Sequence, residues 1–453
     1  MANTVAKYQK YAEYQDSGIE WLGEIPSHWF LKKHKYIAEF SKGKNPELLF
    51  DNYSDGLYPY LSMDSLRGKT DSKYAEYKKG LVLVQDNQPL IIWDGSNSGE
   101  FVLGRKGLLS STMASACLIY EIQDKYYWYL CVCIEPEMRK HATGMGIPHV
   151  NGEELRGIVL PLPELNEQTQ IAKFLDHETT KIDHLIEKQH QLIELLKEKR
   201  QAVISHAVTK GLNPNVPMKD SGVEWLGKVP EHWILSNLKY FASIQGGYAF
   251  NSDLFVEEGT QVLRIGNVYQ NTLSLDRQPI YISNELVKNF KDFIVSKNDV
   301  LMSLTGTLGK RDYGFAIKVK TDEKYLLNQR VAKISPNPSK IDTDFMVYVL
   351  WSESYLTQLY SLPSGTKQAN LSNSDVLGIQ IVVPPSLEEQ KDIAKYLKNK
   401  LLKFDDMILK AESAIQLMQE RRTALISAAV TGKIDVRNWQ APSVTEADTE
   451  LSA

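Results

Sequence analysis

Two segments of this chain each occur twice, and the copies alternate along the sequence. Residues 16–29 return as residues 220–233, shifted by 204 positions, with ten of the fourteen residues identical. Residues 165–175 are echoed by residues 387–397 at an offset of 222. Duplication on this scale predicts two half-proteins, each a structural unit, related by an approximate two-fold axis.

The composition is that of a globular chain. Its 453 residues are enough for two to four domains with ordinary cores, and 43% are hydrophobic and 24% charged. The sequence contains no apolar run long enough to cross a membrane, and its first ten residues lack the apolar block of a signal peptide. We therefore expect a cytoplasmic protein.

The three cysteines are odd in number and confined to one half of the chain. This distribution fits neither a disulfide framework nor a duplicated metal site. We expect buried free thiols at Cys117, Cys131 and Cys133.

The net charge of −4 argues against a protein that coats nucleic acid by electrostatics alone. Basic residues nevertheless cluster locally, and such clusters are either solvated surface or phosphate-binding patches. The clusters are Lys32, Lys33, Lys35, Lys42 and Lys44 in the first half, and Lys310, Arg311, Lys318 and Lys320 in the second.

The repeated segments at 164–212 and 386–434 have the period of long helices, with apolar residues at heptad positions a and d. Neither helix can bury its stripe alone, so we expect an antiparallel intramolecular coiled coil, a rod of roughly 65 to 70 Å. The alternative is two separate helices, each packed on its own domain. The predicted seam residues are Leu175, Ile182, Leu185, Leu192, Leu196 and Val203, then Leu397, Phe404, Met407, Ala414, Met418 and Leu425.

Prolines and glycines mark the ends of both helices. Proline-bearing segments that resemble strand ends precede them, and Gly211 and Gly432 follow them. Residues 213–217 indicate a linker, and the acidic sequence after Asp435 is predicted to be disordered. The predicted order is an N-terminal extension (1–13), a domain (14–163), a helix (164–212), a second domain (213–385), a helix (386–434) and a tail (435–453).

Between the repeats lie two inserts, 30–157 and 234–378, which align with each other only near their ends. Both have the pattern of a mixed α/β (α+β) fold. A chain that keeps its scaffold twice and changes its inserts is expected when the scaffold sets geometry and the inserts set specificity. The strand candidates are residues 81–84, 90–93, 261–265 and 299–304.

A search for catalytic motifs returns nothing. Gly68-Lys69-Thr70 lacks the first glycine of a phosphate-binding loop, and no Gly-x-Gly-x-x-Gly follows a strand. The Asn/Asp-Pro-Pro-Tyr tetrapeptide of amino-methyltransferases is also absent. His28 and His232 recur in the repeat without an acid at ligand spacing, so we interpret them as capping or packing residues. We expect neither a catalytic nor a metal site.

Binding chemistry is better represented, in three loops of small, amide and hydroxyl side chains at 93–99, 266–271 and 303–311. Such loops can donate to phosphates through backbone N–H groups and cations, while Asn, Gln and Arg can recognise base edges. A turn of Gly, Ser and Asn also needs no ligand. The loops are therefore either nucleic-acid contacts or plain turns.

The layout resembles the DNA specificity subunits of type I restriction-modification systems over nearly the whole chain. The resemblance rests on both Asp-Ser-Gly-x-Glu-Trp-Leu-Gly-x-x-Pro-x-His-Trp openings, both Leu-x-Glu-Gln-x-x-Ile-Ala-x-x-Leu helix starts, and residues 303–310 with 327–330. It implies two target-recognition domains that each recognise half of a split, asymmetric DNA sequence, with the paired helices as spacer. It also implies a non-catalytic subunit that docks two modification (methyltransferase) subunits and joins motor-nuclease restriction subunits.

The resemblance further implies that the assembled complex is an adenine-N6 DNA methyltransferase and an ATP-dependent endonuclease. S-adenosylmethionine, ATP and magnesium are then expected in the partner subunits and no cofactor in this chain. Residues 365–371 match the family's closing loop, whereas 144–150 lack its glutamine, which leaves the role of that loop open. The candidate DNA contacts are Lys42, Lys44, Arg67, Lys69, Trp93, Ser96, Asn97, Arg105, Lys106, Arg264, Asn267, Tyr269, Ser303, Thr305, Thr307, Lys310, Arg311, Gln329, Arg330, Lys367, Gln368 and Asn370.

Two other functions remain compatible with the residues themselves. One is a duplicated scaffold that binds proteins through its coiled coil, and the other is an enzyme with an unrecognised site in one insert. Gel shifts with DNA, with and without a methyltransferase partner, distinguish the three.

Overall fold

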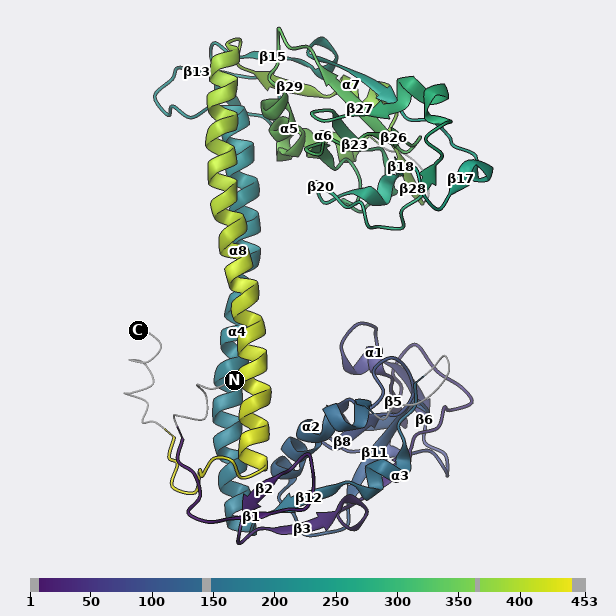
Figure 1. The fold of residues 1–453 in the computed structure, drawn as a ribbon, viewed down its shortest axis with the longest axis vertical. Coiled ribbons are helices and arrows are strands. Elements are labelled where there is room, and N and C mark those ends of the chain that lie inside the picture. The colour runs from purple at the N-terminus through teal and green to yellow at the C-terminus, as the bar shows by residue number, and fades with distance from the viewer. Residues whose placement is uncertain (1–7, 141–147, 363–366, 442–453) are drawn as a thin grey trace. The chain divides into compact units, whose positions relative to one another are not determined.

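The structure is a computed structural model, and it describes residues 8–140, 148–362 and 367–441. The chain divides into two compact units. The first lies within 1–189 and 413–453, and the second comprises 190–412. Each long helix therefore contributes one part to each unit (Figure 1).

The first unit is built on two four-stranded sheets. Its elements are β1 (Tyr14–Asp16), β2 (Glu24–Pro26), β3 (Phe30–Lys33), η2 (His34–Tyr36), β4 (Ala38–Lys42), β5 (Leu57–Leu61), α1 (Met63–Leu66), β6 (Lys73–Glu76), β7 (Leu83–Val84), β8 (Pro89–Ile92), β9 (Phe101–Leu103), β10 (Gly107–Leu109), β11 (Met113–Leu118), α2 (Asp124–Lys140), α3 (Gly152–Gly157), β12 (Val159–Leu162) and parts of the long helices α4 (Leu165–Lys210) and α8 (Leu387–Val430). The sheet orders are β4-β11-β8-β9 and β6-β5-β10-β7. Tyr126 and Leu130 of α2 share one core with Ala114 of β11 and Phe174 of α4, so α2 packs against both sheet and helix.

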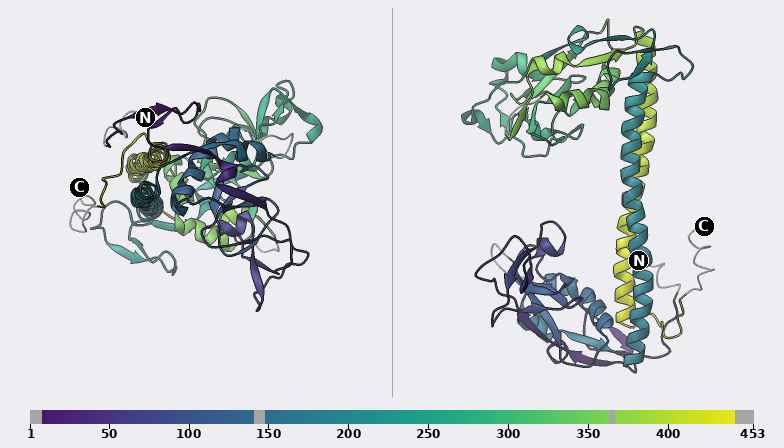
Figure 2. Two further views of the ribbon diagram at one scale, coloured as in Figure 1. Left: turned by 90° about the horizontal axis from the view of Figure 1, so that it is seen from below. Right: turned by 180° about the vertical axis from the view of Figure 1, so that it is seen from behind.

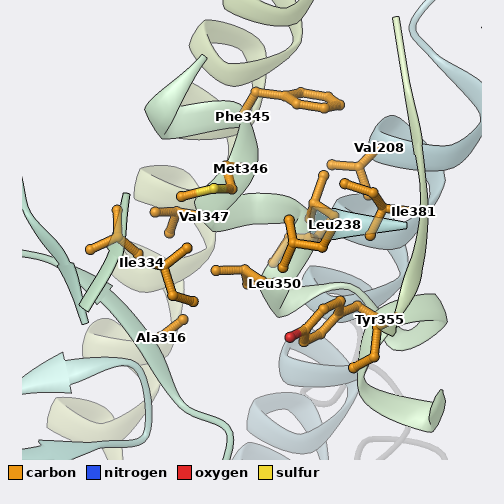
Figure 3. Packing of buried hydrophobic residues seen from close by; sticks show 14 of the residues in the cluster. Val208, Leu238, Ala316, Ile334, Phe345, Met346, Val347, Leu350, Tyr355 and Ile381 are labelled. Atoms are coloured by element: carbon orange, nitrogen blue, oxygen red, sulfur yellow. The ribbon is translucent and has the colours of Figure 1, made fainter. Parts of the chain in front are cut away.

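The second unit repeats this plan. Its elements are β13 (Met218–Asp220), β14 (Lys228–Pro230), β15 (Ile234–Asn237), η3 (Leu238–Tyr240), β16 (Ala242–Gly246), η4 (Ser252–Leu254), β17 (Phe255–Val256), β18 (Thr260–Leu263), η5 (Ile265–Asn267), β19 (Val268–Tyr269), β20 (Thr272–Leu273), β21 (Tyr281–Ile282), η6 (Val287–Phe293), β22 (Ile294–Val295), β23 (Val300–Ser303), β24 (Thr305–Thr307), β25 (Ala316–Lys318), β26 (Tyr325–Leu327), β27 (Val331–Pro336), α5 (Thr343–Trp351), α6 (Glu353–Ser361), β28 (Gln368–Asn370), α7 (Asn373–Gly378), β29 (Gln380–Val383) and the remaining parts of α4 and α8. The main sheet orders are β16-β27-β23-β25 and β17-β21-β18-β26-β22. Figure 3 shows Ala316 and Ile334 of the sheet, Leu350 of α5 and Val208 of α4 in one core.

The two units keep the same strand order although their inserts do not align in sequence. The antiparallel sheet β4-β11-β8-β9 corresponds to β16-β27-β23-β25, and the parallel pair β5 and β10 corresponds to β18 and β26. Strand pairing depends on which positions of a strand are buried, and many different sequences can have the same pattern of buried and exposed positions. The predicted mixed α/β class is confirmed, and the strands predicted at 81–84, 90–93, 261–265 and 299–304 are β7, β8, β18 and β23.

Within each unit, the parts of α4 and α8 lie side by side and run antiparallel (Figure 2). An ion pair joins them in both units: Asp183 to Arg422 at 2.8 Å in the first, and Arg200 to Asp405 at 3.3 Å in the second. A step of 17 residues along α4 therefore matches a step of 17 residues backward along α8. Asp405 and Arg422 are the copies of Asp183 and Arg200 at the offset of 222, so the duplication makes one contact twice.

The heptad phase of the seam differs from the prediction. Residues at position a are buried or half-buried as predicted, but Leu185, Leu192 and Met407 at position d are exposed. Position e takes their place, because a stripe of a and e has the same alternating spacing of three and four residues as a stripe of a and d. The seam residues at a are Leu175, Ile182, Leu196, Val203, Leu397, Phe404, Ala411, Met418 and Leu425, and those at e include Ile186, Ile193, Leu401, Ile408 and Ile415; the predicted Ala414, at d, is half-buried.

The start and the tail of the described chain are packed against α4. The Asp435 N–H donates to the Gln9 carbonyl at 2.8 Å, and the rings of Tyr8 and Trp439 both meet Phe174 edge-on. The prediction of disorder after 435 is therefore wrong for residues 435–441, because the Trp439 ring contacts Phe174 and packs against the core of the first unit. Residues 442–453 lie outside the described part.

All three cysteines are free, and they differ in exposure. Cys131 is buried and Cys133 is half-buried, both on α2. Cys117 is exposed, so the prediction of a buried thiol is wrong there. It lies near the end of β11, where the strand alternation directs its side chain outward.

Candidate nucleic-acid interface

Three arginines of the second unit line one pocket of about 610 Å³. We call it the arginine pocket. It is formed where two neighbouring parallel strands end, because β18 stops at Leu263 and β26 at Leu327, and the carboxyl ends of parallel strands meet at one sheet edge. The pocket is lined by Arg264, Ile265, Gly266, Asn267, Arg277, Gln278, Asn328 and Arg330.

Two of the three guanidinium groups of the arginine pocket are held by neutral partners. Arg277 lies over the ring of Tyr269, 4.8 Å from its centroid, and Arg264 donates to the Gln278 carbonyl. None of the three arginines pairs with a carboxylate in the described residues. A concave site with three unneutralised guanidiniums is suited to phosphates or to the acceptors of a guanine edge.

Three predicted contacts are buried and support the loops instead. Asn267 accepts from the Arg264 N–H at 2.8 Å and donates to the Ser274 carbonyl at 2.8 Å, which holds the 264–277 segment together. Ser303 accepts from the Phe315 N–H at 3.1 Å, and Thr305 is buried in β24. Their amide and hydroxyl groups are not on the surface.

Two loops predicted separately form one two-stranded ribbon. β24 pairs antiparallel with β28, which places Thr307 opposite Gln368 and Thr305 opposite Asn370. The ribbon exposes Thr307, Gln368 and Asn370, and Lys310 and Lys367 are exposed beyond its strands. Residues 365 and 366 of the predicted closing loop lie outside the described part.

Arg311 differs from its neighbour Lys310. Its guanidinium pairs with Glu353 of α6 at 2.7 Å and lies over the ring of Tyr360. Gln329 and Arg330 remain exposed after β26. Of the paired cations at the end of the 303–311 loop, Lys310 is thus the one without an ion pair in the described residues.

The first unit places a different group at the equivalent position. Asp94, after β8, accepts from Lys42 at 2.9 Å and from His149 at 2.6 Å, and the Lys42 ammonium lies 5.8 Å from the Trp93 ring centroid. Burial acts to raise the pKa of Asp94, but the hydrogen bonds to Lys42 and His149 outweigh it and lower this pKa. The end of the 144–150 loop therefore docks on Asp94; residues 144–147 lie outside the described part.

The other predicted contacts of the first unit are more dispersed. Arg67 pairs with Glu100 at 2.6 Å, and Arg105 donates to the Ser65 carbonyl at 2.7 Å. Ser96 is exposed and Asn97 is half-buried. Lys44, Lys69 and Lys106 are exposed and make no ion pair within the part of the chain that is described.

Sequence reasoning missed Arg277, Gln278, Asn328, Asp94 and His149. Gln278 adopts a left-handed backbone conformation, with φ of +45°. Three of these five residues lie in segments that the sequence had singled out: Asp94 in the 93–99 loop, His149 in the 144–150 loop and Asn328 in the Leu-Asn-Gln-Arg run of the resemblance. Arg277 and Gln278 carried no such signal and join the arginine pocket only in the folded chain.

The repeated helix starts join each long helix to its unit. The Glu167 carboxylate accepts from the Tyr11 hydroxyl at 2.7 Å, from His28 at 2.9 Å and from Trp29 at 3.1 Å. Its copy, Glu389, accepts from His232 and Trp233, both at 3.0 Å. His28 and His232 are therefore not caps, since each has a carboxylate partner that the sequence spacing did not show.

The glutamine that follows each glutamate makes a second duplicated contact. Gln168 accepts from the Gln123 N–H at 2.9 Å, next to the start of α2, and donates to the Pro163 carbonyl. Gln390 accepts from the Asp342 N–H at 2.6 Å, at the start of α5, and donates to the Pro384 carbonyl. The Glu-Gln pair thus fixes the start of α2 or α5, a strand end and the opening segment to one helical turn.

Lysines at the far helix ends hold the opening segments from the other side. Lys433 donates to the Leu22 and Glu24 carbonyls, and Lys210 donates to the Leu226 and Lys228 carbonyls. Gly432, with φ of +72°, brings the chain so close to Pro26 that a Cβ would lie 2.2 Å from its Cδ. The repeated motifs therefore build the frame that carries the interface.

In the described ranges, no group of three or more His, Cys, Asp or Glu side chains is placed to hold a metal ion. The helices of the same ranges include none that is long and apolar enough to span a membrane.

The sequence matches the family model of the type I restriction modification DNA specificity domain over residues 26–195 and 230–413. It is similar to the MjaVIII type I restriction enzyme specificity subunit of Methanocaldococcus jannaschii, with 31% identity over 420 residues that cover 91% of this chain and 95% of the relative. It is also similar to the EcoBI specificity subunit of Escherichia coli, at 23% identity over 97% of this chain and 93% of the relative.

A solved structure supports the fold. A chain from a structural study of assembly and conformational transition of the type I R-M system aligns with a TM-score of 0.64 and 15% identity. The alignment covers 90% of this chain and 98% of that one. At this identity the likeness concerns the fold alone.

Proposed function

This chain belongs to the family of type I restriction-modification DNA specificity subunits, and from that premise we propose that each of its two units recognises one half of a split DNA target. One observation carries the proposal. The units share their strand order, yet at equivalent loops the second exposes Thr307 opposite Gln368, and the first pairs Asp94 with the exposed His149. One frame with two sets of polar side chains is what an asymmetric, bipartite target requires.

We also propose that the paired helices set the gap between the half-sites and dock two modification subunits. Exposed apolar residues recur at equivalent helical positions: Leu185 is 41% and Met407 45% exposed, and Leu195 is 62% and Leu417 64% exposed. Each pair is related by the offset of 222. A surface made twice fits two copies of one partner.

The chemistry is assigned to the partners. We propose that the assembled complex methylates adenine at N6 and cuts DNA with ATP, with S-adenosylmethionine, ATP and magnesium bound outside this chain. The purified chain alone should transfer no labelled methyl group to DNA that the complex methylates. Transfer by the isolated chain would place a catalytic site here.

The decisive experiment maps methylated DNA in cells that express the chain with its modification subunits. Arg330→Ala should weaken or relax only the half-site recognised by the second unit, at about 1 to 3 kcal/mol if Arg330 contacts a base. Asn97→Ala is the corresponding test in the first unit, and its effect should be confined to the other half-site. Altered specificity in both halves from either single change contradicts independent recognition. A protein-binding scaffold would give no methylated target sequence at all.

A further inference from the structure

A groove of about 600 Å³ in the second unit is lined by six lysines. We call it the lysine groove. It lies between the turn after β22, the end of β25, the start of α5 and the first turns of α8. Its lysines are Lys297, Lys318, Lys320, Lys391, Lys395 and Lys398, and its acidic residues are Asp342 and Asp344.

The charge of the lysine groove is not neutralised internally. Lys318 pairs with Asp344 at 2.8 Å and Lys297 with Asp322 at 2.7 Å. The other four lysines form no ion pair within the described residues. Three of them, on α8, are spaced by four and then three residues, so they share one helix face, where like charges destabilise the helix. An uncompensated stripe of this kind is suited to an anionic ligand.

The first unit has a groove at the equivalent place with the opposite charge. Its turn carries Asn87 with φ of +62°, where the second unit has Asn298 with φ of +73°, and Asp176 is the copy of Lys398 at the offset of 222. The charged residues that line it are Asp86, Asp124, Lys125 and Asp176. Three aspartates and one lysine thus stand where the second unit has two aspartates and six lysines, so the duplicated frame does not require the lysines.

The side chains of the lysine groove suit phosphates and not bases. Lysine acts as a point charge toward phosphate, whereas base edges are recognised by amide and guanidinium groups. The lining contains no arginine and a single amide, Asn298. Ligands held this way are bound through their charge and independently of sequence.

β25 connects the lysine groove to the interface. At one end, the Ala316 N–H donates at 3.0 Å to the side chain of Asn271 in the β19–β20 hairpin, and the Arg277 guanidinium lies over the Tyr269 ring of this hairpin. At the other end, Lys318 and Lys320 enter the groove. Four residues of extended chain span about 13 Å, so a duplex bound at the hairpin can extend to the groove.

We propose that the lysine groove binds backbone phosphates of duplex DNA that flank the half-site of the second unit, and that the first unit lacks this contact. The proposal rests on the proposed DNA-recognition function. The complex would then contact more flanking DNA beside the half-site of the second unit than beside that of the first. These additional contacts would contribute affinity that does not depend on the DNA sequence.

The test measures binding of a duplex carrying the methylated site, at 50 to 200 mM salt, by the chain assembled with its modification subunits. The variant is Lys391→Gln, Lys395→Gln and Lys398→Gln together. Each lost phosphate contact lowers the slope of log affinity against log salt by about 0.9, so the slope should fall by about 2 to 3. Over this range the wild type should then lose about 40-fold more affinity than the variant. The methylated sequence should stay the same.

The matched control removes the same charge from the same helix, as Lys400→Gln, Lys403→Gln and Lys410→Gln, and should change the slope by less than one. Removing the base pairs that flank the half-site of the second unit should lower the salt slope of the wild type by the same amount. It should leave the salt slope of the variant unchanged. An unchanged slope with specific binding intact overturns the proposal, as does loss of the modification subunits from the variant, which would indicate an acidic protein surface as ligand. If the wild type shows no specific binding, the proposed function itself fails.

Discussion

Glu167 and Glu389 occupy equivalent positions at the starts of α4 and α8 but differ in burial. The Glu167 side chain is 8% exposed and accepts three hydrogen bonds, whereas Glu389 is 33% exposed and has no counterpart of the Tyr11 hydroxyl among its donors. Burial and the bond to Glu167 raise the pKa of Tyr11 well above its usual range, so this hydroxyl stays a donor. We therefore expect Glu167 to contribute more to the stability of the first unit than Glu389 contributes to the stability of the second.

We predict that Glu167→Ala lowers the free energy of unfolding by about 3 kcal/mol, because it leaves buried donors without an acceptor. Glu389→Ala should cost about 1 kcal/mol, since water can reach its partners. Urea unfolding of both variants, followed by tryptophan fluorescence, measures the difference. Equal losses of unfolding free energy would mean that Glu167 and Glu389 contribute equally to stability.

His34 is a buried residue with a pH-dependent role. It donates from Nδ1 to the Leu155 carbonyl at 3.1 Å and accepts at Nε2 from the Tyr127 hydroxyl at 2.9 Å. Burial lowers its pKa from 6.5 to about 4. The unfolded chain therefore binds the proton more readily between these two pH values, and the stability present above pH 6.5 is lost as the pH falls toward 4.

We predict that His34 alone removes about 3 kcal/mol of unfolding free energy between pH 7 and pH 4. His34→Leu should remove this part of the pH dependence, and Leu238 shows that the frame accepts leucine at the equivalent position. Denaturant titrations of wild type and variant at several pH values provide the measurement. Parallel pH profiles would show that His34 is protonated equally in both states.

At the scale of elements, α4 and α8 use heptad positions a and e, and polar pairs flank that seam. Asp183 with Arg422 and Arg200 with Asp405 are partly exposed, so each pair contributes at most about 1 kcal/mol. The two ion pairs instead specify the register of the helices, because a shift of one helix by one turn would separate the charges of both pairs. Apolar burial supplies the stability.

Adjacent residues of α4 provide a direct check of this phase. Ile193 is 6% exposed and Leu192 is 40% exposed. We predict that Ile193→Ala costs about 2 to 4 kcal/mol of unfolding free energy, and Leu192→Ala about 1 kcal/mol or less. Denaturant unfolding of the two variants measures these losses. A larger loss of unfolding free energy for Leu192→Ala would indicate that the seam uses positions a and d.

At the scale of the whole molecule, the duplication specifies where the helix pair can be lengthened. Leu192 and Ala414 are copies of each other at the offset of 222. Seven residues added after Leu192 and seven after Ala414 keep the apolar seam in phase. The helix pair then grows by about 10 Å.

We predict that this double insertion leaves the recognised bases unchanged and widens the unspecified gap between them by about 3 base pairs. A single insertion in either helix is the control and should disrupt the seam. Methylated sites sequenced from cells expressing the variant give the gap directly. An original gap in a folded, assembled variant would show that the helices do not measure the DNA.

Much of this architecture follows from local pattern in the sequence. Repeats at fixed offsets determined the duplication. Heptad spacing, with proline and glycine at the helix ends, determined the approximate extents of α4 and α8, and short strand patterns determined the mixed α/β class, because all of these signals lie in the order of residues along the chain. Only tertiary structure decided what distant segments do together. Parallel pairing of β18 with β26 brought Arg264 and Arg330 to one pocket. Packing of the repeated segment at 16–29 on the start of α4 brought His28 within hydrogen-bond distance of Glu167. Tertiary structure also buried Asn267 and packed Trp439 on α4. These contacts depend on which surfaces meet, and local periodicity carries no information about that.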